Sequence, residues 1–299
     1  MSVSAASPYQ DRLQEYAESL LRERFTRPGW CVLALDPDVP VARAAFWATP
    51  DTAAPTDLVL IEADWNDPDL AGGRALLAHM HERAAALGAA TLRHHVDSPP
   101  TAPQYQEHES ARARLLTGSG YQLLRDGLRW RFAISTPDEP MPQTSLAFRS
   151  LAEVGEGAFV EAIAATYEGT RDSWLTREIQ ERGVVGAARS DFTDYQEMDY
   201  LPDWWELAYA EGGELAGVIM AARNPSVSVI AYVGVVPRQR GRGLAAQLVG
   251  RGTRQLAVSG ATEIRGDCDR DNIAMVKAFQ RAGYEQLARR RSYELTLSD

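Results

Sequence analysis

The sequence predicts an α/β protein made of two tandem copies of one domain, and three observations support this fold class. Segments with strand-like and helix-like spacing alternate along the 299 residues. The stretch from Gly120 to Ser135 resembles the stretch from Gly283 to Ser298, with the same offset of 163 residues at both ends. Residues 136–143 (TPDEPMPQ) hold three prolines and show no periodicity. We therefore predict a first domain over residues 1–135, a linker over 136–145 and a second domain over 146–299.

The first half shows the spacing of helices and of short strands. Amphipathic periodicity and helix-stop signals predict helices over residues 11–24, over 70–87 and in a short segment ending at Gly120. Apolar runs predict strands over 30–35, 41–48, 58–63 and 91–96, and a hairpin-like tail that ends near Ser135.

The same pattern restarts after the linker. It predicts strands over 146–152, 206–210, 214–222, 227–236 and 263–268, and a final strand pair ending near Leu297. The second and third of these form a hairpin around residues 211–213. Helices are predicted over 157–167, 172–182, 241–259 and 272–282.

Composition excludes several classes of protein. The formal charge of -10 and the pI of about 5.1 argue against nucleic-acid binding, which needs a basic surface, and suit a cationic small substrate. Cys31 and Cys268 match no disulfide or metal spacing, and the five histidines form no metal motif, so we expect no metal. There is no signal-peptide pattern and no apolar run long enough to span a membrane. We expect a soluble cytoplasmic protein.

One turn in the second half has the features of an anion site. A strand ending in Val235-Val236-Pro237 runs into Arg-Gln-Arg-Gly-Arg-Gly (238–243), and a helix follows. Glycines allow a tight turn, and the first N–H groups of a helix point outward at the positive end of its dipole. Such a turn binds a pyrophosphate. Leu244-Ala245 stands where a P-loop needs Lys-Ser/Thr, and the third glycine of a dinucleotide fold is missing.

This turn resembles motif A of the GCN5-related N-acetyltransferases, the GNAT family. A second stretch, Asn272 to Tyr284, resembles the family's Asn-x-x-Ala…Gly-Phe segment at the expected distance. The resemblance implies that each copy is a mixed, mostly antiparallel twisted sheet flanked by helices, with splayed central parallel strands. It implies acetyl-CoA, or another acyl-CoA, as co-substrate.

The resemblance also implies the coenzyme-binding residues. Val235 and Val236 correspond to the strand end that pairs with the pantetheine arm, and Asn272 to the asparagine beside that arm. The pyrophosphate loop corresponds to Arg240, Gly241, Arg242, Gly243, Leu244 and Ala245. Phe279 lines the pantetheine wall and stands where family members often have the tyrosine that protonates the departing thiolate.

The catalytic groups are less determined by the sequence. The acid is Tyr232 or water, or the thiolate leaves unassisted, or the domain binds acyl-CoA without catalysis. For the base, the segment 191–206 mixes acids with aromatics and is predicted to be a loop that attracts a cationic amine. Its candidates are Asp203 and Glu206, and the alternative is a solvated acidic loop with packed tryptophans.

The first half has a degenerate copy of the turn. Residues 64–73 (DWNDPDLAGG) carry aspartates where a pyrophosphate would sit, and Pro68 lacks an N–H donor. We predict that this copy does not bind coenzyme A in the usual way, and that Asp67 or Asp69 caps the helix.

The predicted function is an acetyl-CoA-dependent N-acyltransferase that passes its acyl group directly to the amine of a small, cationic substrate. The alternative is a non-catalytic acyl-CoA-binding regulatory or scaffold protein. The expected partners are a small-molecule amine, without nucleic acid or membrane, in a monomer or homodimer.

Overall fold

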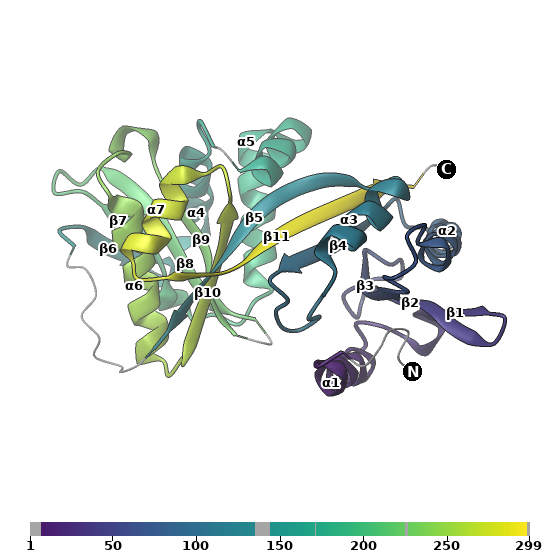
Figure 1. Cartoon of the computed structure of the whole chain (residues 1–299). Coiled ribbons are helices and arrows are strands. Elements are labelled where there is room, and N and C mark those ends of the chain that lie inside the picture. Colours follow the sequence, from purple (N-terminus) through teal and green to yellow (C-terminus); the bar gives the residue numbers. More distant parts are fainter. Residues whose placement is uncertain (1–6, 135–143, 171, 225–226, 298–299) are drawn as a thin grey trace. The chain divides into compact units, whose positions relative to one another are not determined.

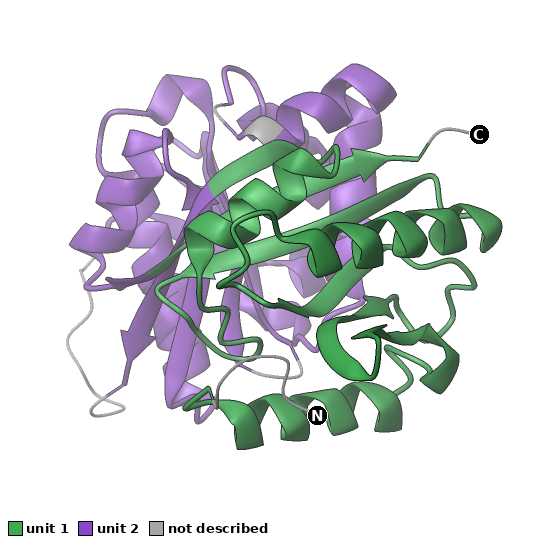
Figure 2. Cartoon of the chain, turned by 45° about the vertical axis from the view of Figure 1, so that its right-hand side comes forward, with its two compact units in different colours: residues 1–126, 288–299 green, residues 127–287 purple. Residues whose placement is uncertain are grey.

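The computed structural model describes residues 7–134, 144–170, 172–224 and 227–297. The chain forms two compact units (Figure 2): unit 1 is residues 1–126 with 288–299, and unit 2 is residues 127–287. Most of the predicted linker lies outside the described residues. The domain limits 1–135 and 146–299 stay a prediction.

Unit 1 is a five-stranded sheet with helices, in the strand order β1-β2-β3-β4-β11 (Figure 1). Its core is one cluster of buried apolar side chains that includes Trp30, Phe46 and Met80. The elements are α1 (Gln10–Arg22), η1 (Pro28–Trp30), β1 (Cys31–Asp36), β2 (Val39–Trp47), β3 (Asp57–Ala63), α2 (Ala71–Ala86), β4 (Thr91–Ser98), α3 (Glu109–Gly118) and most of β11 (Glu285–Thr296).

Unit 2 has the strand order β5-β10-β9-β8-β7-β6. The pair β9–β10 is parallel and the other pairs are antiparallel, which confirms the mixed, mostly antiparallel sheet. The elements are β5 (Gln122–Ala133, mostly in this unit), β6 (Ala147–Ser150), α4 (Leu151–Thr166), α5 (Ser173–Gln196), η2 (Pro202–Trp204), β7 (Trp205–Tyr209), β8 (Leu215–Arg223), β9 (Ser228–Val235), η3 (Pro237–Gln239), α6 (Leu244–Val258), β10 (Glu263–Asp269) and α7 (Ile273–Arg281).

Helices cover both faces of the unit 2 sheet. Trp205 of β7 packs against Phe159 of α4 and Phe192 of α5 on one face. The next residue, Glu206, points to the other face, where it pairs with Arg251 of α6. This division decides which side chains can meet at a site.

The two ends predicted as strand pairs are each one long strand instead. β5 and β11 are 12 residues long and keep the offset of 163 found in the sequence. The dipeptide Asp126-Gly127 is typical of a turn, but in β5 Gly127 continues the ladder and pairs with Asp269. β11 contains no glycine, proline or asparagine that would favour a turn.

Two local predictions in the second half are also wrong. The strand predicted over 146–152 ends at Ser150, because the Glu153 carboxylate accepts a hydrogen bond from the Ser150 N–H (2.6 Å) and starts α4 there. The loop predicted over 191–206 is helical as far as Gln196. Ala188 and Phe192 are buried four residues apart, so packing extends α5 through this segment.

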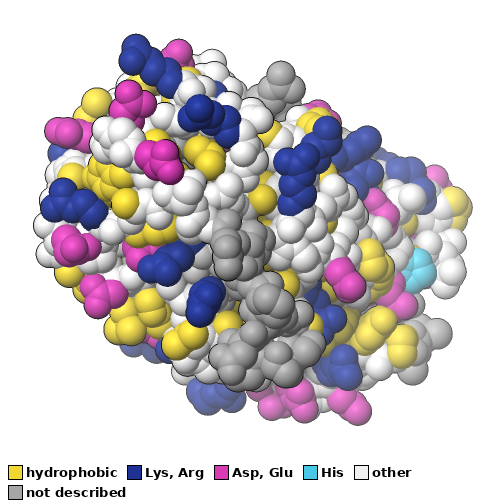
Figure 3. Space-filling view, turned by 90° about the vertical axis from the view of Figure 1, so that its left-hand side faces the viewer, with side chains coloured by type: hydrophobic (Ala, Val, Ile, Leu, Met, Phe, Trp, Pro, Cys, Tyr) yellow, Lys and Arg dark blue, Asp and Glu magenta, His cyan; other side chains and the backbone are white. Residues whose placement is uncertain are grey.

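No helix in the described ranges is long and apolar enough to cross a membrane. On the face of the molecule in Figure 3, acidic and basic side chains are interspersed, without one continuous basic patch. Within the described residues, no group of three His, Cys, Asp or Glu side chains could hold a metal ion.

Candidate functional site

The candidate site in unit 2 begins where its two parallel strands separate. β9 and β10 pair only in the rows Ser228–Ile264 and Val229–Arg265. From Ile230 to Val235, β9 is paired with β8 on its other side, and no described strand pairs with its free edge. Extended ligands bind to such an edge through main-chain hydrogen bonds.

The turn after β9 presents a row of unpartnered N–H groups. Gly241 and Gly243 have φ of 78° and 76°, in the left-handed region that glycine adopts without strain, and α6 begins at Leu244. Among the described residues, no backbone acceptor faces the N–H groups from Gly241 to Ala245. Consecutive free donors at the start of a 15-residue helix form an anion site, because the helix dipole adds positive potential there.

The two arginines of the turn are held in place by the chain. Arg240 donates from Nε to the Val235 carbonyl (3.0 Å) and from Nη2 to the Thr166 carbonyl (2.8 Å). Arg242 donates to the side chain of Gln239, which is buried and in turn donates to Glu214 (3.2 Å). The Val236 N–H is bonded to the Ala216 carbonyl (3.1 Å). These bonds fix the turn and leave both guanidinium groups exposed beside it.

Asn272 and Phe279 have structural roles in the ligand-free chain. The Asn272 carboxamide caps α7 by accepting from the Met275 N–H (3.3 Å). Phe279 is 1% exposed, and its ring stacks on Trp130 with centroids 5.7 Å apart. The structure therefore does not place the Phe279 ring on an open surface.

Tyr232 lies within the free-edge stretch of β9 and faces α4 and α5. Its hydroxyl is hydrogen-bonded to Thr166 Oγ1, and its ring is 6.5 Å from that of Tyr167 and 5.9 Å from that of Tyr195, between centroids. Burial raises the pKa of the Tyr232 hydroxyl, so this group stays protonated at neutral pH. Thr166 thus contacts both Tyr232 and Arg240.

The two predicted bases are not brought to this cluster. Glu206 lies on the opposite face of the sheet, where both carboxylate oxygens accept hydrogen bonds from Arg251 (2.7 Å each). Asp203 is exposed in η2, and its backbone carbonyl accepts from Gln255 (3.1 Å). The acid that does reach the cluster is Asp191, which accepts a hydrogen bond from the Tyr167 hydroxyl.

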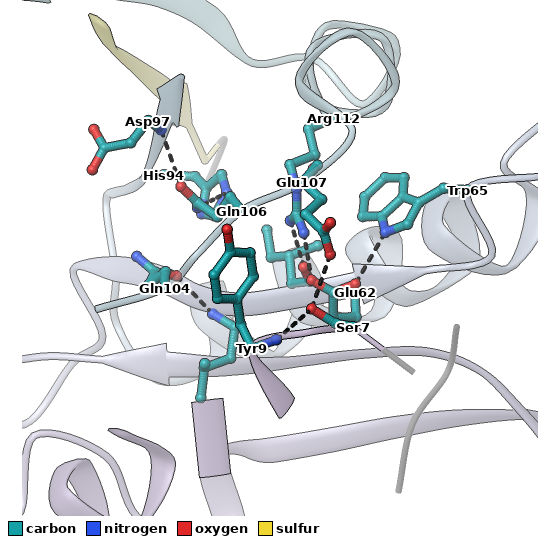
Figure 4. Close-up of polar contacts among 12 residues, drawn as sticks. Ser7, Tyr9, Glu62, Trp65, His94, Asp97, Gln104, Gln106, Glu107 and Arg112 are labelled. Atoms are coloured by element: carbon teal, nitrogen blue, oxygen red, sulfur yellow. Dashed lines mark hydrogen bonds and ion pairs between the residues drawn. The ribbon is translucent and has the colours of Figure 1, made fainter. Parts of the chain in front are cut away.

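In unit 1, the parallel strands β3 and β4 also separate, but the chain fills the gap itself (Figure 4). Their only pairing row is Asp57–Arg93. On the β3 side, the Leu60 N–H donates to the side-chain oxygen of Gln104 (2.9 Å). On the β4 side, the Gln106 carboxamide accepts from the Asp97 N–H (3.1 Å) and donates to the His95 carbonyl (2.6 Å).

His94 closes the rest of this gap. Its Nδ1 is hydrogen-bonded to the Leu58 carbonyl (2.8 Å) and its Nε2 to the Gln106 carboxamide (3.2 Å). Burial lowers the pKa of His94 to about 3, so the ring is neutral and can donate at one nitrogen while it accepts at the other. The carboxamides of Gln104 and Gln106 and the His94 ring therefore bond main-chain groups on both strand edges of this gap.

The helix start of unit 1 is filled in the same way. Asp67 stands four residues before the first residue of α2, as Arg240 does before α6. Its carboxylate accepts hydrogen bonds from the N–H groups of Asp69 (3.0 Å) and Ala71 (2.7 Å). The sequence predicts Asp67 or Asp69 as the cap of this helix; Asp67 accepts from the first helical N–H, although Leu70 occupies the N-cap position.

Comparisons with known proteins agree with this geometry. Residues 166–284 match the model of the acetyltransferase (GNAT) family. An acetyltransferase of Sodalis glossinidius is 30% identical over 90 residues, which are 30% of this chain, and the match spans 63% of that protein's length.

Two solved structures resemble almost the whole chain. A GCN5-related N-acetyltransferase from Sphaerobacter thermophilus has a TM-score of 0.58 at 20% identity, over 96% of this chain and 90% of that one. A tandem GNAT protein from the clavulanic acid biosynthesis pathway has a TM-score of 0.53 at 16% identity, over 97% and 94%. At these identities the likeness shows the tandem fold.

Proposed function

Since this chain belongs to the GNAT acetyltransferase family, matched over residues 166–284, we propose that it is an acetyl-CoA-dependent N-acyltransferase. It transfers the acetyl group directly to the amine of a small cationic substrate in a ternary complex. The observation that carries the proposal is the row of free N–H groups from Gly241 to Ala245, directly after a strand with an open edge. The two features suit the pyrophosphate and the amide groups of one extended ligand.

The coenzyme is placed as follows. Its pyrophosphate accepts from the N–H groups of residues 241–245, and Arg240 and Arg242 add positive charge beside it. Its pantetheine arm runs along β9, from Val235 toward the point where β9 and β10 join at Val229. A strand advances about 3.3 Å per residue, and the open edge of β9 is only a few residues long. The thioester, at the far end of the arm, would therefore lie near Tyr232.

The chemistry requires two proton transfers. An alkyl ammonium has a pKa of about 10.4, so a base must take its proton before the nitrogen can attack the thioester carbon. The C–S bond then breaks, and the thiolate, whose conjugate thiol has a pKa of about 8.5, accepts a proton. Tyr232 is protonated at neutral pH and is our candidate for the donor, although its hydroxyl points its proton at Thr166 in the ligand-free chain and would have to turn to the thiolate.

A second candidate function is binding of acyl-CoA without catalysis. It is favoured by Phe279, which has no proton to give and is packed in the core. Thiol release from acetyl-CoA in the presence of a panel of primary amines separates the two. Tight coenzyme binding with no release above hydrolysis would favour the second candidate.

The binding site is tested with Gly241→Asp. The substituted carboxylate would stand among the free N–H groups, so we expect acetyl-CoA binding measured by calorimetry to be lost. Gly88→Asp is the matched control: Gly88 also has a positive φ (84°) and open space around it, but it follows α2 in unit 1. Unchanged affinity of Gly241→Asp, or equal loss in the control, would contradict the assignment.

A further inference from the structure

A carboxylate that has no cationic partner among the described residues lies beside the aromatic cluster of unit 2, formed by Tyr167, Tyr195 and Tyr232. Asp191 of α5 accepts the hydrogen bond of the Tyr167 hydroxyl. Among the described residues, no arginine or lysine forms an ion pair with it. Tyr167 is 2% exposed, whereas Asp191 and Tyr195 are partly exposed. The carboxylate is thus partly buried and still open to a small molecule.

The surroundings of Asp191 favour a positive ligand. Burial raises the pKa of Asp191 to about 6, a net value in which the charges of Asp194, Glu178 and Asp172 also act upward and the Tyr167 hydrogen bond acts downward. Among the described residues, the groups that interact with the carboxylate are Tyr167, which follows α4, Tyr232 from β9, Glu178 and Asp194 from α5, and Asp172 at the start of that helix. None of them is basic, and aromatic faces attract cations.

The cluster is connected to the proposed coenzyme site through one residue. Thr166 bonds Tyr232 through its side chain and Arg240 through its carbonyl. Its hydroxyl donates to the Ile163 carbonyl (2.7 Å), so the Tyr232 hydroxyl is the donor in the Thr166–Tyr232 pair. The lone pairs of the Tyr232 oxygen therefore remain available to accept a hydrogen bond from an ammonium group.

We propose that Asp191, held by the buried Tyr167 hydroxyl, is the general base of the acetyl transfer, and that Asp191 with Tyr195 and Tyr232 binds the acceptor as a primary ammonium with an apolar or aromatic body. This inference rests on the proposed function. The ammonium gives one proton to the Asp191 carboxylate, and the free amine forms the N–C bond to the thioester carbon. The C–S bond breaks, the nitrogen loses its second proton as the thiolate takes one up, and Asp191 releases the first proton to water. One proton is produced for each amide formed.

The test compares Asp191→Asn with Glu197→Gln, which removes an exposed charge at the end of the same helix. Thiol release is measured with acetyl-CoA and a panel of primary amines that includes tyramine, 2-phenylethylamine and putrescine. We expect kcat/KM of Asp191→Asn to fall at least about 100-fold at pH 7, a typical effect of losing a general base. The kcat/KM of the control should stay within about two-fold of wild type, a change of only RT ln 2 in activation free energy, because no catalytic group is lost.

A pH profile distinguishes a base from a merely structural residue. The wild-type rate should rise as pH passes through about 6, where Asp191 loses its proton. The deficit of Asp191→Asn should shrink about tenfold per pH unit between pH 8 and 10, because the free amine itself becomes abundant. Asp191→Glu should recover part of the rate, and calorimetry should give the same acetyl-CoA affinity in all variants.

The outcomes separate the two proposals. Normal turnover and an unchanged pH profile in Asp191→Asn would overturn the base and leave the proposed function standing. A deficit that is the same at every pH would also overturn it, because the residue would then act only on structure. No turnover of any amine by the wild-type chain would overturn the proposed function and the base together.

Discussion

Replacing Glu206 with glutamine tests whether this buried acid belongs to the chemistry or to the fold. Its carboxylate is 8% exposed and accepts two hydrogen bonds of 2.7 Å from the Arg251 guanidinium. That guanidinium also lies 4.9 Å from the centroid of the Phe148 ring. Glutamine keeps the shape, but only one of its two terminal atoms can accept, and its amide N–H groups would face the donors of Arg251.

The size of the effect follows from burial. Removing one partner of a fully buried ion pair costs about 3–5 kcal/mol, because the other charge is left uncompensated. The Arg251 side chain is 38% exposed, so water can solvate it after the change, and we expect a loss of about 2 kcal/mol in the free energy of unfolding. For a unit of this size the melting temperature should fall by roughly 4–8 °C.

Two measurements on the same samples decide the question. Thermal denaturation should show the loss for Glu206→Gln and a smaller loss for the double variant Glu206→Met/Arg251→Met, in which no charge is left behind. Thiol release per folded molecule should stay within about threefold of wild type, less than the 10²–10⁴-fold effect of a general base. An unchanged melting temperature together with a large loss of rate would refute the structural role and restore Glu206 as a base.

Three further predictions concern other parts of the chain. Full-length protein should bind one acetyl-CoA, counted by calorimetry, because Asp67 and the glutamine side chains fill the site of unit 1; two per chain would contradict this. Asp191→Asn should melt at a higher temperature than wild type at pH 8 and not at pH 4. Because the pKa of the Asp191 carboxyl is raised from 3.8 to about 6 in the folded chain, wild type loses at most about 3 kcal/mol of stability as the pH rises from about 3.8 through about 6. An equal effect of the substitution at both pH values would disprove this. Gly266→Ala should cost about 1–3 kcal/mol in a denaturation experiment, since its Cβ would lie 2.6 Å from the Phe279 ring, whereas Gly157→Ala, in open space, should cost nothing.

The elements that the sequence predicts correctly are those whose signal is local. The repeat that links Gly120 to Gly283 appears in the structure as β5 and β11, two strands of equal length at the same offset. The turn at 238–243 has the left-handed glycines and the free N–H groups that its composition predicts. Both features depend on residues next to one another in the chain, so periodicity and glycine placement were sufficient.

The cluster of Asp191, Tyr167 and Tyr232 depends on packing between distant segments. The mixture of acids and aromatics predicts a loop around Asp191, yet the burial of Ala187, Ala188 and Phe192 makes the segment helical. The helical spacing of those apolar residues was a usable signal. The hydrogen-bond partner of Asp191, Tyr167, is 24 residues away in the chain, and no sequence pattern indicates that the two side chains meet.

The side of the sheet on which Glu206 lies also depends on packing that the sequence pattern does not predict. Alternation along a strand predicts that Trp205 and Glu206 point to opposite sides, but it does not say which side meets α4 and α5. That choice is made by the aromatic contacts of Trp205 with Phe159 and Phe192. No periodic pattern in the sequence predicts the hydrogen bonds of Gln104 and Gln106 to the strand edges.

Because of those glutamine side chains, the stability of the two units should depend differently on the concentration of coenzyme. A protein that binds a ligand only when folded gains RT ln(1 + [L]/Kd) in stability, so unit 2 should become more resistant to heat and proteolysis as acetyl-CoA rises. In unit 1 the carboxylate of Asp67 and the amides of Gln104 and Gln106 are part of the chain and present at a fixed effective concentration. Unit 1 therefore keeps its strand gap closed at any level of the metabolite, and starvation for acetyl-CoA would loosen one unit of the chain while the other stays as stable as before.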